Sequence, residues 1–120
     1  MTIPHIEAIL PAWQDEFGAS ITVIGRNYKI LYMNEKSATT NSKWGGKALI
    51  GQDVRACHQE SSVRLIEHIL ETGEPHTYTI EKQGVKKFIY QAPWREQGSI
   101  AGVVELSIEI PAEIPHYIRS

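Results

Sequence analysis

The strongest constraint on the fold of this chain is an alternation of apolar and polar residues near its C-terminus. From residue 104 to residue 110, every second side chain is apolar and the ones between them are polar. The apolar positions are Val104, Leu106, Ile108 and Ile110, and the polar positions are Glu105, Ser107 and Glu109. Successive side chains of a β-strand point to opposite faces, so the pattern predicts a strand with one dry face and one wetter face.

The neighbouring segments predict further strands of the same sheet. The preceding run shows a similar pattern, with one face formed by Phe88, Tyr90, Ala92 and Trp94. Residues 77–82 also alternate, and Gln83-Gly84 and Gln97-Gly98 supply the turns between the three runs. Near the N-terminus, "SITVIGRNYKILYMN" holds two β-rich runs around Gly25-Arg26-Asn27, which is a hairpin signal. The sequence therefore predicts five antiparallel strands.

One longer helix is expected between the two groups of strands. It begins at Ser61 or Ser62, because serine is a good N-cap, and it runs to Glu71. Gly73 is placed to terminate it. Shorter helical turns are expected between residues 35 and 50.

These elements predict the α+β class, with a five-stranded antiparallel sheet covered on one face by short helices and one longer connecting helix. A chain of 120 residues is long enough for one domain with one core. We divide it into an N-terminal helical flank (1–17), a core domain (18–110) and a C-terminal tail (111–120).

Composition excludes several classes of protein. Apolar residues make up 42% and charged residues 22%, which argues against disorder. The net charge is −2 and no Lys/Arg-rich run occurs, so nucleic acid is not an expected partner. The sequence has neither a secretory signal nor a run of about 18 apolar residues, so we expect a cytoplasmic protein that does not contact membranes.

The N-terminal flank carries a wide apolar stripe at helical spacing, interrupted by Pro11, where we expect a kink. The stripe consists of Ile6, Ile9, Leu10, Trp13 and Phe17. It either packs on its own domain or pairs two subunits. The second alternative makes the protein a homodimer, with these residues at the dimer interface.

The order of elements resembles that of a PAS domain. "ITVIGRNYKILYMNEKSA" looks like the opening PAS hairpin, whose second strand leads into an asparagine, here Asn34, and a short helix. "YQAPWREQGSIAGVVELSIEI" looks like the last two PAS strands, with Gly98 and Gly102 at the expected places. "LIGQDVRACHQESSVRLIEHILETGEP" is similar to the stretch leading into the long connecting helix. The resemblance covers roughly residues 18–110.

A Cys-His pair before this helix is similar to a subgroup of bacterial PAS domains, some of them attached to hemerythrin-like proteins. That subgroup has a proline after the histidine, whereas Gln59 stands here. A second departure lies at the end of the last strand, where PAS domains commonly have Asp-Ile-Thr and this chain has Glu109-Ile110-Pro111. Pro111 opposes continuation into a helix, and we expect no fused output domain after it.

The resemblance implies a non-enzymatic sensory or regulatory module that binds a small ligand or a signalling protein and signals through association. A small α+β enzyme is the remote alternative, because no acid, base or nucleophile set is evident in the sequence. The cofactor is unknown, and none is required by the sequence. Some PAS domains bind haem, which makes a haem-based sensor with His58 as the iron ligand a further alternative.

The role of Cys57 and His58 stays open at this point. They either shape the approach to the helix, hold a metal or haem, or supply a redox-sensing thiol. The space between the long helix and the sheet is either a filled core or a cavity for a small, largely apolar molecule. The residues expected to line it are Cys57, His58, Val63, Ile66, Ile69, Leu70, Tyr90, Trp94 and Leu106.

Overall fold

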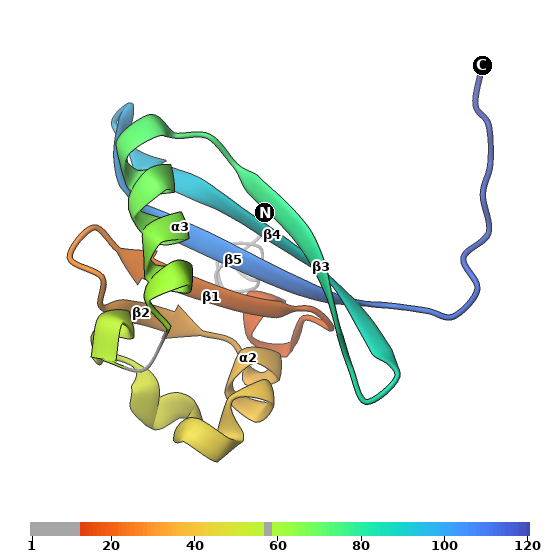
Figure 1. The fold of residues 1–120 in the computed structure, drawn as a ribbon, viewed down its shortest axis with the longest axis horizontal. Coiled ribbons are helices and arrows are strands. Elements are labelled where there is room, and N and C mark those ends of the chain that lie inside the picture. Colours follow the sequence, from red (N-terminus) through yellow and green to blue (C-terminus); the bar gives the residue numbers. More distant parts are fainter. Residues whose placement is uncertain (1–12, 57–58) are drawn as a thin grey trace, which may run out of the picture.

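The fold is known from a computed structural model, which describes residues 13–56 and 59–120 (Figure 1). Five strands form one antiparallel sheet in the order β2-β1-β5-β4-β3. The strands are β1 (Ser20–Gly25), β2 (Ile30–Met33), β3 (His76–Lys82), β4 (Val85–Glu96) and β5 (Ser99–Ile110). The predicted α+β class and the five-stranded antiparallel sheet are confirmed.

The helices precede β3 in the described part of the chain. The α-helices are α2 (Glu35–Thr40) and α3 (Glu60–Thr72), and the 3-10 helices are η1 (Trp13–Glu16), η2 (Ser42–Trp44), η3 (Gly46–Leu49) and η4 (Val54–Ala56). Figure 1 shows α3 lying across one face of the sheet, with α2, η2, η3 and η4 on the β2 side of the sheet. None of the helices in residues 13–56 and 59–120 has the length and apolar character needed to cross a membrane.

The longer helix forms where the sequence predicts it, with one difference at its start. It begins at Glu60 with Gln59 as a cap residue that makes no side-chain capping bond, so the predicted serine N-cap was wrong. Arg64 pairs with Glu60 one turn earlier at 2.7 Å, which favours the earlier start. Gly73 ends the helix as predicted, with φ 75° and its N–H donating to the Ile69 carbonyl.

Two tight turns hold β3, β4 and β5 together as a meander. Gln83 and Gly84 have φ 53° and 80°, and Gln97 and Gly98 have φ 50° and 84°. Two consecutive positive φ values are typical of the type I′ hairpin turn, whose twist matches that of the flanking strands. The predicted turns at both dipeptides are confirmed.

The helices cover the opposite face of the sheet from the one that the alternation led us to expect. Val103 is fully buried in one cluster with Ile24 and the α3 residues Ile66, Ile69 and Leu70. Phe88 and Ile108, on the other face, are 38% and 41% exposed. The expectation that Leu106, from the apolar series at residues 104–110, lies under the helix was therefore wrong. Both faces carry apolar residues, and the alternation defines two faces without deciding which one a helix covers.

On the outer face of the sheet, the indole of Trp94 links β4 to β1. Trp94 lies opposite Gly102, and its Nε1 donates to the Ile24 carbonyl on β1 at 3.1 Å. A Cβ atom at Gly102 would collide with that carbonyl oxygen and with the indole nitrogen. The absent side chain thus permits a hydrogen bond that ties β4 to β1 across β5.

Asn34 joins the N-terminal flank, β1 and α2 through a fully buried side chain. Its Oδ1 accepts from the backbone N–H groups of Ile21 at 3.0 Å and Ser37 at 2.9 Å. Its Nδ2 donates to the carbonyls of Gln14 at 2.9 Å and Ala19 at 2.8 Å. One amide thereby satisfies four backbone groups and caps α2.

Tyr32 makes a second tie to the flank, with its hydroxyl donating to the Asp15 carboxylate. Partial burial, followed by this bond and the charge of Asp15, raises the pKa of Tyr32 from 10 to about 12. A raised phenol pKa means that this contribution to stability is complete below pH 10 and disappears as the pH rises through about 12.

Replacing Gly102 with alanine should destabilise the sheet, because the new methyl group cannot fit without breaking the Trp94–Ile24 bond. We expect a loss of about 2 kcal/mol or more in the free energy of unfolding, measured in urea. Gly18→Ala is the matched control, since no atom lies within 4 Å of a Cβ there, and it should change stability little. Equal stability of the two variants would contradict the close packing described for Gly102.

Asn34→Ala should lower the free energy of unfolding by about 3 kcal/mol, because it leaves several buried backbone groups without partners. Asn27→Ala serves as the control, because Asn27 accepts one exposed bond from the Lys29 N–H. Its effect should stay below about 1 kcal/mol. A loss for Asn34→Ala no larger than for the control would show that the network is not a stabilising link.

Candidate functional site

A pocket of about 180 Å³ lies between the helical layer and the sheet. Its apolar lining is Ile24, Ile30, Met33, Leu49, Val54 and Ile66. Its polar lining is Thr22, Asn41, Ser62, Tyr78, Gln91 and Glu105. Contributions from α3, from the loop region before it and from all five strands make this the place where the two layers of the fold meet.

Gln91 and Glu105 form the polar side of the pocket on the sheet. They lie opposite each other in the β4–β5 ladder, so both side chains stand on the face that α3 covers. Gln91 Nε2 donates to Glu105 Oε2 at 2.6 Å, and Gln91 itself is 5% exposed. Gln91 Oε1 is a buried oxygen for which no hydrogen-bond partner exists among the described residues. The pocket wall thus contains a carboxylate that a buried amide holds in place.

Tyr78 contributes a phenol from β3 to the same region. Burial is the main cause of a raised Tyr78 pKa, and the negative charge of Glu105 raises it further. The phenol therefore stays protonated through neutral pH and can donate its hydrogen. Its ring also lies 5.2 Å from that of His76, centroid to centroid.

A second polar group lies at the α2 side of the pocket. Thr22 Oγ1 and Ser37 Oγ are 2.6 Å apart and share a hydrogen bond. Asn41 Nδ2 donates to the Ser37 carbonyl at 2.9 Å, at the C-terminus of α2. Because Asn34 binds the Ser37 N–H, these wall residues connect to the network that holds the N-terminal flank.

The predicted cavity residues on α3 lie on the expected side of the helix. Ile66 lines the pocket, Ile69 and Leu70 are buried in the core beside it, and Val63 is partly buried. Cys57 and His58 lie outside the described residues, so their role and the haem alternative stay predictions.

The predicted cavity residues on the sheet lie on the wrong face. Tyr90 pairs with Leu106, one position out of phase with Gln91 and Glu105, and Trp94 pairs with Gly102. All three side chains therefore stand on the face away from α3. The Trp94 indole has the Ile24 carbonyl as its partner, not a pocket group. The error follows from assigning the more apolar face to the helix.

Sequence reasoning missed the residues that replace them: Thr22, Tyr78, Gln91 and Glu105. We had expected Glu105 to solvate the wetter face of its strand. Gln91 and Glu105 face each other in the middle of the sheet, and such a polar pair could have predicted a polar pocket wall if the register of the two strands had been known. The ladder shifts by one residue between Trp94 and Arg95, so the turn at Gln97-Gly98 alone would pair Gln91 wrongly.

Of the predicted dimer residues, Ile6, Ile9 and Leu10 lie outside the described residues. Trp13 and Phe17 are 50% and 48% exposed, and their rings meet edge to face at 5.2 Å. Their exposure leaves both alternatives for the flank standing, and the dimer stays a prediction.

Neither a family model nor a curated protein sequence matches the chain. Solved structures do match it over most of its length. A sensory box sensor histidine kinase from Vibrio cholerae has a TM-score of 0.63 at 15% identity, covering 91% of this chain and 95% of that one. The PAS domain of a protein from Colwellia psychrerythraea has a TM-score of 0.62 at 19% identity, covering 88% and 97%. The chain has the PAS fold.

The predicted resemblance to PAS domains is thus confirmed at the level of the fold. The similarity to a Cys-His subgroup depends on Cys57 and His58, which lie outside the described residues, and it stays a prediction. The pocket occupies the space between the PAS sheet and its connecting helix, α3.

A further match, to the Vibrio cholerae protein VqmA, corrects the expectation that nucleic acid is not a partner. The structure of the VqmA–ligand–DNA complex from Vibrio cholerae has a TM-score of 0.66 at 17% identity, covering 91% of this chain and 51% of that one. The expected set of partners, a small molecule or signalling protein without nucleic acid, was therefore wrong to exclude nucleic acid. This chain spans about half of the VqmA chain, and the charge of 120 residues does not determine the partners of a longer protein with this fold.

Glu105→Gln should lower the Tyr78 pKa, because it removes a negative charge that opposes ionisation of the phenol. The pKa should stay above 10, since burial is the larger cause of the shift. A pH titration of the Tyr78 ring by NMR measures it. Glu109→Gln, four residues along the same strand, should leave the Tyr78 pKa unchanged, and an equal change in both variants would contradict the local effect of Glu105.

Proposed function

We propose that this PAS domain is a sensory module that binds a small molecule in the pocket between α3 and the sheet. The pocket itself carries the proposal, because it lies between the two layers of the fold and combines apolar side chains with the Gln91–Glu105 pair. The cavity of about 180 Å³ exceeds the roughly 150 Å³ of an engineered cavity that takes benzene. A molecule of one ring with a few substituents fits that volume.

The mixed lining supports binding with a defined orientation. Apolar side chains such as Ile24 and Ile66 supply the surface that excludes water, and a few polar groups supply direction. The ligand would touch α3 through Ser62 and Ile66 and the sheet through Thr22 and Gln91. Contacts on both layers allow it to favour one arrangement of helix and sheet, which is what a ligand must do to shift a population.

A route for the signal begins at Thr22 in the pocket wall. Its hydroxyl shares a hydrogen bond with the Ser37 hydroxyl, and the Ser37 N–H donates to Asn34. Asn34 in turn donates to the Gln14 carbonyl of η1. A ligand that competes for the Thr22 hydroxyl therefore acts on the group that holds the N-terminal flank.

The proposed activity is binding without catalysis. Glu105 is the one carboxylate among the described lining residues, and it is already engaged by the Gln91 amide. The Tyr78 phenol in the same wall has a raised pKa, so it stays protonated at neutral pH and is a poor general base.

Filling the pocket should weaken the binding of one-ring molecules. A panel of toluene, benzyl alcohol and benzylamine, followed by ligand-observed NMR on the full chain, should detect binding to the wild type. Ile66→Phe adds volume inside the pocket and should weaken binding of the best panel member about tenfold or more. Its overpacking costs about 1–3 kcal/mol, so circular dichroism must first confirm that the variant is folded.

The matched control is Ile108→Phe, the same substitution on the exposed outer face of the sheet. It should leave the affinity for every panel member unchanged. Failure of all three molecules to bind the wild type, or equal weakening by both variants, would overturn the proposed binding site.

A further inference from the structure

The orientation of the Gln91 amide is dictated by its neighbour. A carboxylate accepts hydrogen bonds and donates none, so the amide must turn its N–H group toward Glu105. The amide oxygen then points away from the carboxylate and is the atom left without a partner. Gln91 is 5% exposed, so bulk solvent does not reach this oxygen.

The Glu105 carboxylate is therefore the charged acceptor on the sheet side of the pocket. Its Oε2 accepts one bond from Gln91, and the carboxylate has capacity for more. The hydroxyls of Thr22, Ser62 and Tyr78 can act as donors or acceptors, so they accommodate either kind of ligand. A ligand that places an acceptor against Glu105 would oppose its negative charge, whereas N–H groups would use its free capacity.

The negative charge of Glu105 further restricts the class of ligand that the pocket can bind. Glu105 is the one charged side chain among the described residues that line the pocket. No lysine, arginine or histidine in the described part of the chain forms an ion pair with it, and Lys36 is paired instead with Glu109 at 3.4 Å. A neutral ligand would displace water from the carboxylate without replacing its stabilisation, whereas a cation would compensate for that loss.

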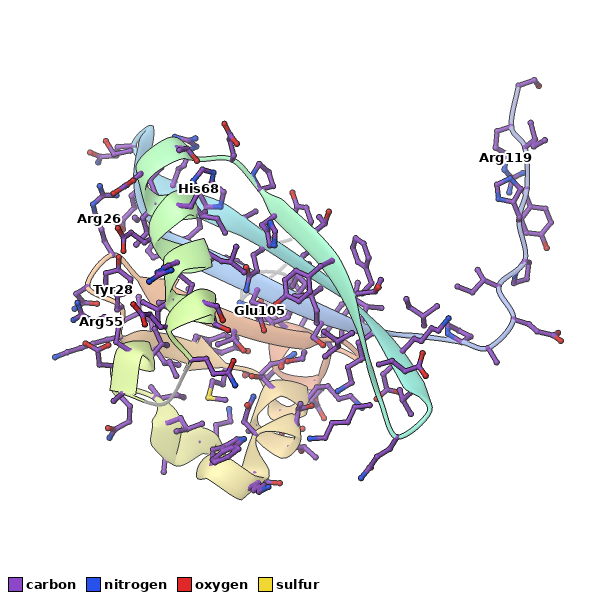
Figure 2. All side chains as sticks on the ribbon, viewed as in Figure 1. Arg26, Tyr28, Arg55, His68, Glu105 and Arg119 are labelled. Atoms are coloured by element: carbon purple, nitrogen blue, oxygen red, sulfur yellow. The ribbon has the colours of Figure 1, made fainter. Side chains whose placement is uncertain are left out.

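We propose that the pocket selects a compact organic cation, a single-ring-sized body that carries an ammonium or amidinium group. The cationic N–H groups bind the Glu105 carboxylate, which also accepts a hydrogen bond from the Gln91 amide. The apolar body packs on the side chains of Ile24 and Ile66. Figure 2 shows Glu105 on the sheet beside the first turns of α3, and both elements contribute to the pocket lining. This inference rests on the proposed function, because it names the ligand class of the same pocket.

The test compares three molecules of nearly the same shape on the full chain at neutral pH: benzylamine, which is a cation, benzyl alcohol and toluene. Isothermal titration calorimetry or ligand-observed NMR should show that benzylamine binds about tenfold or more tightly than benzyl alcohol, as expected for one hydrogen-bonded charge pair. Benzyl alcohol keeps a donor without the charge, and toluene has neither. Equal affinity for all three would overturn the cation proposal while leaving the binding pocket in place.

Two variants assign the preference to the wall residues. Glu105→Gln should bring the affinities for benzylamine and benzyl alcohol to within about twofold of each other. Glu109→Gln, with the same change of charge on the same strand outside the pocket, should keep the wild-type preference. A preference that survives in Glu105→Gln, or disappears in Glu109→Gln, would overturn the proposal.

Gln91→Met tests the residue that orients the Glu105 carboxylate, and it does not depend on whether the Glu105 variant folds. It keeps the carboxylate but removes the hydrogen bond that orients it, so it should weaken benzylamine binding more than toluene binding, because toluene does not use the carboxylate. Equal effects on both molecules would remove Gln91 from the proposed site. Binding of none of the three molecules to the wild type would overturn the cation proposal and the proposed function together.

Discussion

The pairing of β4 with β5 decides which side chains meet α3, and most of the structure depends on it. The ladder shifts by one residue between Trp94 and Arg95, so that Gln91 faces Glu105 on the helix side and Tyr90 faces Leu106 on the other. A shift of one residue moves every following side chain to the opposite face. The bulge therefore sets both the polarity of the pocket and the apolar character of the outer sheet surface.

Asn34 gives that pocket a connection to the N-terminal flank. The Asn34 amide makes four hydrogen bonds to backbone groups, and breaking any one of them leaves a buried group unsatisfied, so the amide holds these segments together rigidly. Ser37, which binds Asn34 through its N–H, also binds the pocket residue Thr22 through its hydroxyl. The Tyr32–Asp15 bond adds a second attachment for η1, so the flank is coupled to the sheet at two places.

The PAS fold narrows the function without settling it, because one fold serves many functions. The neighbours include a sensory box sensor histidine kinase and a protein in complex with a ligand and DNA. What separates such proteins lies in the pocket chemistry and in what the fold is attached to. For this chain the informative chemistry is the Gln91–Glu105 pair beside a cavity of about 180 Å³.

Local patterns in the sequence determined the elements: the alternation marked the strands, the two Gln-Gly dipeptides the turns, and Gly73 the end of α3. These signals act over a few residues, so they were correct for the fold and for the inward side of α3, including Ile66. The covered face of the sheet was not predictable in the same way. It depends on a one-residue bulge and on packing of Val103 against a helix more than 30 positions earlier in the chain. Only the tertiary structure could therefore bring Gln91 and Glu105 into the pocket and place Tyr90, Trp94 and Leu106 outside it, because register and burial are set by contacts between distant segments.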